Sequence, residues 1–460
     1  MSSLFSVLSI SSNALGAFTQ AMNVTGENTA NASTPGYAKQ VAQLVAQPFD
    51  TQLAVGGGVR YGGTVDTRDQ YAEQNVRQCV SAQGQATQEL QQYTSLQDVF
   101  PVDGQTGISV ALSGFFNAFS ALTTAPNDAD LRQTALDSAQ QVVQAFNQSI
   151  TQLNEVSDGV EQTLTEQVGQ VNQLAQQIAS INQQIEQNAS AAIDPGLSAQ
   201  MSSTLQQLAQ YADVSAVKQD NGTTNVNIGQ SSIVSGDQAQ ALQLVPGNGQ
   251  MSVEDSQGNN VAAGLQSGSL QAVLNMTSTV LPSTLANLNQ MAQSFATAVN
   301  GALEGGVDQS GVPQANLSAQ DLFSFNAAAG AAATMSVNPL TTSQLALADP
   351  ASPGGDAVAV QIANLQQATN LIPGQTQTLS DYYGSLASQV GQLVSNAQND
   401  QTTTESLTAQ AQSSCQNVEG VSLDEEAMNL LEYQRGYEAM SKVVETIDEI
   451  TYELINDMVQ

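Results

Sequence analysis

The chain has 460 residues, enough for several domains, and 41% of them are hydrophobic, an ordinary share for a protein that folds around an apolar core. Only 11% are charged, and 8 Lys and Arg residues face 41 Asp and Glu residues, which gives a formal net charge of -33. Such a surface repels nucleic acids and anionic membranes, because both are bound through Lys and Arg side chains. We therefore expect no nucleic-acid partner.

Residues that carry acid–base or metal chemistry are scarce. The chain has no His, the commonest proton-transfer group and metal ligand near neutral pH. Cys79 and Cys415 are far apart and neither has a CxxC partner, so no zinc or redox motif is visible. We expect no enzyme activity, no cofactor and no metal. Two free thiols and one disulfide between early and late segments both remain open.

The first 33 or so residues have the pattern of an amphipathic helix with a heptad seam. Apolar residues recur at alternating steps of four and three, with Ser11 filling one position. The seam consists of Leu4, Leu8, Leu15, Phe18 and Met22. The helix is expected to end before Thr34, since Pro35 disfavours helix in the residue before it and Pro35-Gly36 favours a type II turn.

The C-terminal segment mirrors this pattern. Ser422 can cap a helix, and the three acids Asp424, Glu425 and Glu426 suit its positive end. The assembly residues expected on this helix are Leu430, Tyr437, Met440, Val444, Ile447, Leu454 and Met458. Taken alone, each terminal helix could lie on its own globular domain. Two seams at opposite ends of the chain can instead cover each other.

Between these ends the pattern changes several times. Alternation and Gly clusters predict a β-hairpin at about 40–70. Helical patterns follow at about 71–100, 110–125, 128–190, 197–211, 270–303, 357–372 and 376–418. The stripe from Leu153 to Ile185 would be about 50 Å long as one helix, a length typical of rods and bundles.

Two inserts interrupt the helices. Period-two apolar patterning with Asn-Gly and Ser-Gly turns predicts strands at about 213–266, and residues 305–355 are irregular. The expected fold is mainly α with β inserts: a long helical bundle or coiled coil formed by the terminal segments, with a small strand-rich outer domain. The expected domains are a terminal coiled coil (1–37 with 421–460), a helical rod (38–212 with 267–304 and 356–420) and an outer domain (213–266 with 305–355).

The helix stop after the first seam also carries a resemblance. The run Asn28-Thr29-Ala30-Asn31-Ala32-Ser33-Thr34-Pro35-Gly36-Tyr37 resembles the signature of the rod/hook family of bacterial flagellar axial proteins. The helix start Leu423-Asp424-Glu425-Glu426 is most similar to the hook-associated protein 1 group of that family, which forms the hook–filament junction. The family motif residues are Asn28, Asn31, Thr34, Pro35, Gly36, Tyr37, Leu423, Asp424, Glu425 and Glu426. Family members commonly have Ile at the position of Thr29 and Arg at that of Lys39.

The resemblance implies a structural subunit of the flagellum that assembles in a ring with copies of itself. Its implied partners are the hook protein, a second junction protein or the filament, the flagellar export apparatus, and an export chaperone that binds the C-terminal helix. It implies an extracellular location in the flagellum. The first residues lack a basic n-region, so we expect export without a cleaved signal peptide. No apolar run is long enough for membrane insertion.

Other functions stay open as alternatives. A hook or distal-rod protein of the flagellum would share the paired ends. A secreted adhesin or effector could bind a ligand through residues 213–266. A carboxylate-based glycosidase would need two convergent acids roughly 5–10 Å apart.

Overall fold

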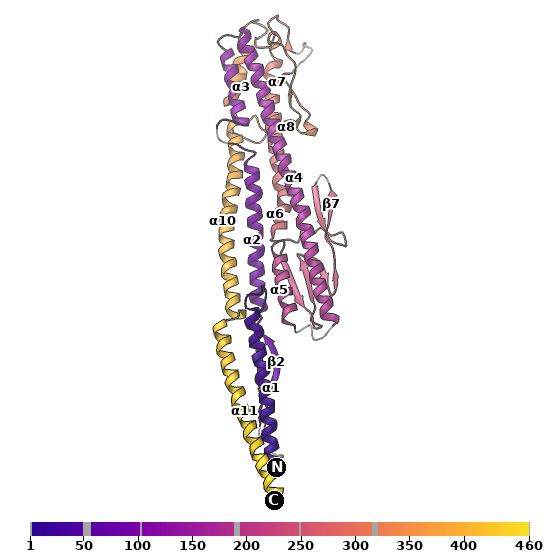
Figure 1. The fold of residues 1–460 in the computed structure, drawn as a ribbon. Coiled ribbons are helices and arrows are strands. Elements are labelled where there is room, and N and C mark those ends of the chain that lie inside the picture. The colour runs from indigo at the N-terminus through magenta and orange to yellow at the C-terminus, as the bar shows by residue number, and fades with distance from the viewer. Residues whose placement is uncertain are drawn as a thin grey trace.

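The computed structural model describes residues 2–48, 57–101, 104–187, 194–247, 250–314 and 321–459. The molecule is a long rod, and both termini lie together at one end of it (Figure 1). The chain runs out along the rod in α2 (Gln70–Gln97), back in α4 (Ala129–Gln187), out again through α6 (Ser269–Asn275) and α7 (Leu281–Glu304), and back in α10 (Leu379–Glu419) to the end that holds both termini (Figure 1). This layout agrees with the expected mainly α fold with β inserts.

Long helices lie side by side along the rod (Figure 1). They are α2, α4, α10, and α6, which continues through a π-helical turn (Met276–Val280) into α7. The expected stripe from Leu153 to Ile185 is mostly buried and lies on one helix. With 59 residues, α4 is about 90 Å long.

The end of the rod far from the termini is closed by short elements. They are α3 (Ile108–Leu122), α8 (Ala331–Thr334), α9 (Ala357–Asn364), the strands β9 (Phe323–Ser324) and β10 (Ser336–Val337), and 3-10 turns at Ala327–Ala329, Thr342–Gln344 and Leu365–Gln367. Phe115 packs against Phe119, Phe295 and Phe323, with ring centroids 4.6 to 6.0 Å apart. This aromatic cluster fixes the turn-back point of the chain.

The strand-rich insert packs beside the C-terminal half of α4. Its strands are β3 (Val214–Lys218), β4 (Thr224–Ile228), β5 (Ser231–Ser235), β6 (Gln238–Ala239), β7 (Gln243–Gly247) and β8 (Gln250–Glu254), preceded by α5 (Pro195–Ala209). The order β3-β4-β5-β6 forms one antiparallel sheet, and β7 pairs with β8. Two Asn side chains of α4 hold it: Asn172 donates to Leu242 O and Asn182 to Thr224 O.

The second insert, residues 305–355, lies elsewhere. It is held by the start of α4, where the buried Arg132 donates to Thr342 O at 2.8 Å and to Leu345 O at 2.9 Å. Arg132 and Asn172 are separated by 40 residues of one helix, which is about 60 Å. The expectation that 213–266 and 305–355 form one outer domain is therefore wrong. A continuous helix between their attachment points keeps them apart.

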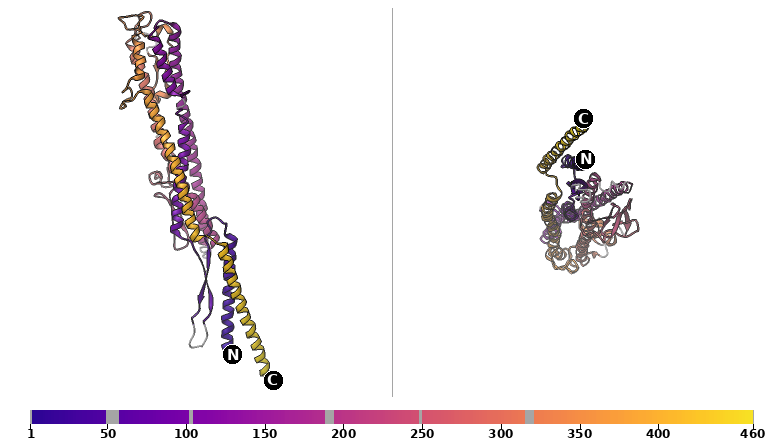
Figure 2. Two further views of the ribbon diagram at one scale, coloured as in Figure 1. Left: turned by 90° about the vertical axis from the view of Figure 1, so that its left-hand side faces the viewer. Right: turned by 90° about the horizontal axis from the view of Figure 1, so that it is seen from below.

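The terminal part consists of α1 (Ser2–Asn31), α11 (Leu423–Val459) and a hairpin of β1 (Gln40–Ala46) and β2 (Val59–Asp66). Helix α1 contacts both α11 and the hairpin, which lie on different sides of it (Figure 2). The helix bounds agree with the predicted stop before Thr34 and start after Ser422. In the described part of the chain no helix is long and apolar enough to cross a membrane.

Candidate functional site: the joint between the terminal helices and the rod

The turn after α1 has the predicted geometry. Tyr37 N donates to Thr34 O at 3.2 Å, and Gly36 has φ +74°, as the third residue of a type II turn requires. Asn31 precedes the turn, and its side chain accepts from the Thr34 hydroxyl. A β-carbon on Gly36 would lie 2.4 Å from the carbonyl oxygen of Ala199 on α5. Only glycine fits this turn against the rod.

Asn28 ties the end of α1 to the start of the hairpin. Its buried amide donates to Gln40 O and accepts from Gln40 N, both at 2.8 Å, and it also accepts from the Tyr37 hydroxyl at 2.9 Å. Burial raises the pKa of Tyr37 to about 12, and the nearby carboxylates of Glu27 and Glu426 act in the same direction. The phenol therefore stays neutral and donates.

The second half of the motif starts α11. Glu426 N donates to Ser422 O at 2.9 Å, and Glu425 N lies 3.4 Å from the Ser422 hydroxyl, which is the expected cap. Leu423, Asp424 and Glu425 are exposed, whereas Glu426 is 1% exposed. The three acids are thus not equivalent, since only Glu426 points into the joint.

Lys39 brings the two halves of the motif together. Its ammonium lies 2.8 Å from Glu425 Oε1 and 3.8 Å from Glu426 Oε1. The segment after α1 is thereby ion-paired to the first turn of α11. The compact ammonium of Lys39 lies near two carboxylates at once, whereas the guanidinium of an Arg would form two parallel hydrogen bonds to a single carboxylate.

Glu419, the last residue of α10, is a functional residue that the sequence analysis missed. Its carbonyl accepts from Lys39 N at 2.8 Å, and its carboxylate accepts from Asp69 N at 2.7 Å. It thus joins the rod to both ends of the hairpin. Burial raises the pKa of Glu419. No local pattern could have revealed this role, because Asp69 is 350 residues away in the chain.

A second ion-paired group lies beside it. Glu73 pairs with Arg68 and Arg77 and accepts from the Ser202 hydroxyl at 2.6 Å. Arg68 also donates to Gly36 O at 2.8 Å, so the turn after α1 is linked to α2 and α5. Arg68 and Glu73 are each 13% exposed at the side chain, which makes this a largely buried network.

The two cysteines flank a small apolar cluster of Val76, Val80, Ala209 and Ala411. Both are free thiols. Burial, followed by the Glu419 carboxylate, raises the pKa of Cys415 to about 12. A thiol with that pKa stays protonated and unreactive at neutral pH. Of the two possibilities that the sequence left open, the structure has the free thiols.

The seam residues of α1 lie at the edge of its packed face. Leu4, Leu8, Leu15, Phe18 and Met22 are half-buried, whereas Ala14, Ala17, Ala21 and Val24 are buried. Small residues fill the buried line because α1 is covered on two sides, by α11 and by the hairpin. Phe18 lies over Gly436 of α11, where a β-carbon would meet its ring at 2.8 Å.

On α11 the predicted residues differ in burial. Ile447 is buried, Leu430, Met440 and Val444 are half-buried, and Tyr437 and Leu454 are each 39% exposed. The side chain of Met458 lies outside the described residues. The seam is therefore only partly covered within one chain.

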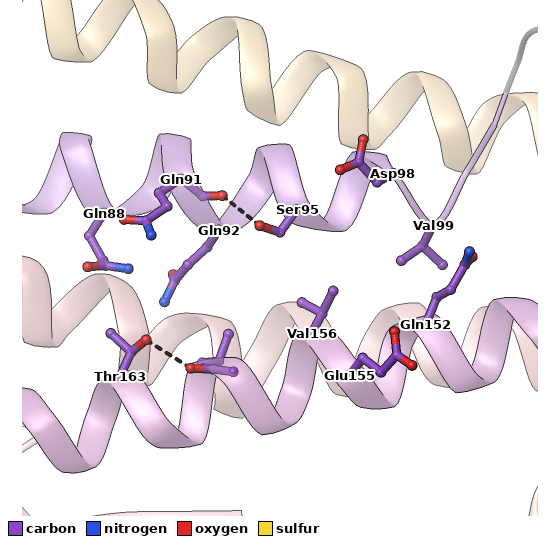
Figure 3. Close-up of a pocket in the computed structure, with 12 residues that line it drawn as sticks. Gln88, Gln91, Gln92, Ser95, Asp98, Val99, Gln152, Glu155, Val156 and Thr163 are labelled. Atoms are coloured by element: carbon purple, nitrogen blue, oxygen red, sulfur yellow. Dashed lines mark hydrogen bonds between the residues drawn. The ribbon is translucent and has the colours of Figure 1, made fainter.

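Two cavities bear on the chemistry. One of about 820 Å³ lies at the joint, lined by the turn Thr34–Tyr37 and by residues from α2 and α10. Another, of about 470 Å³, lies between α2 and α4, and Gln92 extends into it toward α4 (Figure 3). Half of its twelve lining residues carry carboxamides or hydroxyls, which bind by hydrogen bonds. Among the described residues, no group of three or more His, Cys, Asp or Glu side chains could hold a metal ion.

Comparison with known proteins agrees with this architecture. The family described as flagellar hook-associated protein FlgK helical domain matches residues 93–318, and flagellar basal body rod FlgEFG protein C-terminal matches residues 416–457. The flagellar hook-associated protein 1 of Bacillus subtilis (strain 168) is 25% identical over 100% of this chain and 99% of its own length. That of Salmonella typhimurium is 23% identical over 96% and 98%.

A solved structure is also similar. The flagellar hook junction protein FlgK from Burkholderia pseudomallei superposes with a TM-score of 0.67 at 15% identity, over 75% of this chain and 100% of that one. The shared fold, the family matches and the full-length relatives lead to one assignment. The chain is similar over its whole length to the flagellar hook-associated protein 1 family.

Proposed function

We propose that this chain is a structural subunit of the bacterial flagellum that forms the junction between hook and filament and assembles through its paired terminal helices. One observation carries this proposal. Among the described residues, ten of eighteen exposed large apolar side chains lie on α1 or α11. These two helices hold only 67 of the 460 residues. Apolar surface gathered in this way marks a site that another chain covers.

The partners follow from the family. Copies of the chain would form a ring whose terminal helices line the central channel, between the hook protein on one side and a second junction protein or the filament on the other. We infer that the chain reaches this extracellular position through the flagellar export apparatus, with a chaperone on its C-terminal helix. Its role is mechanical and needs no cofactor.

The joint supports a mechanical role. Helix α11 is inclined to α10 (Figure 1), and the terminal part meets the rod through the ion pairs and hydrogen bonds of Lys39, Glu73 and Glu419. A connection made of few, specific polar contacts fixes one geometry without a large apolar interface. This would let the outer part keep its contacts while the ends follow the lattice of the hook.

The direct test removes apolar side chains from the far end of α11 without removing the helix. Ile450, Leu454 and Ile455 are exposed, and we expect their joint replacement by Ser to leave cells with hooks, no filaments and flagellin in the medium. The matched control replaces Val217, Val360 and Leu407, which are similarly exposed but lie outside the terminal helices. Normal filaments in the first variant would refute the proposal.

A deletion distinguishes the proposed junction function from the second candidate function. The match of residues 416–457 to the rod family keeps a hook or distal-rod protein as the second candidate. Removal of residues 421–460 should give complete hooks without filaments if the chain forms the junction. Incomplete hooks would assign it to the hook or rod instead.

A further inference from the structure

The hairpin presents an apolar face that no described residue of the chain covers. Val41 is 43% exposed, Val45 36% and Val65 47%. Val41 is the cross-strand partner of Val65, and Val45 is the partner of Arg60, so these four side chains share one face of the two-stranded sheet. The alternate residues of β1, such as Ala42 and Leu44, are less exposed.

This shared face depends on a bulge. The register shifts between Ala42 and Leu44, which pair with Thr64 and Tyr61, so β2 has an extra residue at Gly62–Gly63. Gly63 has φ +116°, and a β-carbon on Gly62 would lie 2.5 Å from a methyl group of Val45. Without the bulge, Val65 and Arg60 would point to opposite faces, because they are five positions apart.

Helix α11 has a second uncovered apolar face. Met428 is 63% exposed and Leu431 54%, and residues three apart share a helix face. This face is turned away from the side that carries Glu426, Val444 and Ile447, which are covered or half-covered within the chain. The exposed acids Asp424 and Glu432 lie four residues on either side of Met428.

We propose that the outer face of the hairpin in one copy packs against the Met428–Leu431 face of α11 in the next copy. This inference rests on the proposed self-assembly and names the surfaces that meet. The two faces are complementary, since each has an apolar centre. The hairpin adds the cation of Arg60, and α11 adds the carboxylates of Asp424 and Glu432. Because the hairpin and α11 lie on different sides of α1 (Figure 2), one copy can use both faces at once.

Such a contact is heterologous: each copy offers one face to one neighbour and the other face to the next. Heterologous contacts that repeat produce a closed ring or a helix, as a junction requires, whereas a self-complementary contact stops at a dimer. The scarcity of cations in this chain supports the proposed pairing of the hairpin with α11. Arg60 is one of only 8 Lys and Arg residues in the chain, and it is exposed on the face that would meet acids.

Paired cysteines in the full-length chain test this contact. Cells would express the double variant Val45→Cys with Met428→Cys, and isolated hook–filament structures would be oxidised and separated without reductant. We expect a ladder of covalently linked copies. The matched control combines Val45→Cys with Tyr437→Cys, an exposed position nine residues from Met428 and therefore on the opposite side of α11, and should give monomers. The native Cys79 and Cys415 are present in both variants.

The outcomes separate this inference from the proposed function. Absence of the chain from the isolated structures would refute the proposed function. Its presence there without a ladder, a ladder in the Tyr437 control instead, or a link within one chain would overturn the contact alone. As a second readout, Arg60→Glu should abolish filaments and Glu432→Arg in the same chain should restore them. Normal filaments with Arg60→Glu alone would also overturn the contact.

Discussion

Lys39 holds the two halves of the family motif together, and its loss should loosen the joint. In Lys39→Met the buried Glu426 loses the ammonium that lies 3.8 Å from its carboxylate, and breaking a buried ion pair costs about 3–5 kcal/mol. We expect the lower end of this range, because Glu425 is 52% exposed at its side chain. Denaturant unfolding would measure the cost, and hydrogen exchange at Gln40 would locate it.

Two controls accompany this prediction. Lys39→Arg should keep most of the stability because it keeps the charge. Glu425→Gln should cost no more than about 1 kcal/mol, as for an exposed ion pair. Equal stability of the Met and Arg variants would show that the charge at this position is irrelevant.

Tyr37 should make the joint sensitive to alkali. Its pKa is raised to about 12 in the folded chain, compared with about 10 for a free phenol, so folding favours the protonated form. The resulting stability is complete below about pH 10 and is lost as the pH rises toward 12. Tyr37→Phe should reduce this loss and should cost about 1 kcal/mol at neutral pH through the bond to Asn28.

The measurement compares the pH dependence of unfolding in the two proteins. The difference between them isolates Tyr37, because Tyr93, Tyr382 and Tyr433 also have raised pKa values and are unchanged in the variant. Parallel stability curves from pH 9 to 12 would contradict the assignment.

At the scale of elements, the sequence predicts the helices well because their signals are local. Apolar periodicity, the Pro35-Gly36 turn and the Ser422 cap each act within a few residues. Contacts between distant segments were not predictable in this way. Glu419 binds Asp69 from the other end of the chain. The buried apolar residues of α1 are Ala14, Ala17, Ala21 and Val24, outside the predicted seam, because the hairpin covers a second side of the helix. A heptad pattern describes a helix that packs against a partner on one side, so it does not identify residues that a second partner buries.

The terminal helices are the elements most dependent on assembly. Seam residues that are half-buried in one chain contribute only part of the free energy that full burial would give. That contribution must offset the conformational entropy that α1 and α11 lose when they become ordered. We therefore expect the parts of α1 and α11 that lie away from the joint to be largely unfolded in the dilute monomer, whereas the contacts of Lys39 and Tyr37 hold the residues next to the joint. Removal of residues 1–20 and 440–460 should then leave the helical circular dichroism signal per molecule almost unchanged.

The rod serves as the internal standard for this prediction. Its helices α2, α4 and α10 share one continuous core and should unfold together in both proteins. A loss of signal proportional to the removed residues would mean that the ends are folded before assembly.

At the scale of the whole molecule, charge should oppose assembly. The net charge is -33, and four of the eight cations, Lys39, Arg68, Arg77 and Arg132, are engaged in contacts within the chain. Copies therefore repel one another over the Debye length, which falls from about 30 Å at 0.01 M salt to about 8 Å at 0.15 M. Self-association should increase over this range.

Sedimentation velocity at several salt concentrations would test this expectation. The triple Ser variant at Ile450, Leu454 and Ile455 has the same charge and provides the baseline, since it should stay monomeric throughout. If salt instead weakens the association of the wild-type chain, attraction between opposite charges outweighs the overall repulsion.

The attachment of the inserts at separate points of α4 has a consequence for engineering. The strand-rich insert is bound to the second half of that helix, away from the turn-back point and from the ends of the chain. In its turn at Asp220–Gly222 the residues Asp220 and Asn221 are exposed, and Asn221 is bonded to Glu186 at the end of α4, so a foreign domain added there should leave the core intact. The chain is thus a natural display scaffold, able to present cargo around the base of a filament while its two ends still build the junction.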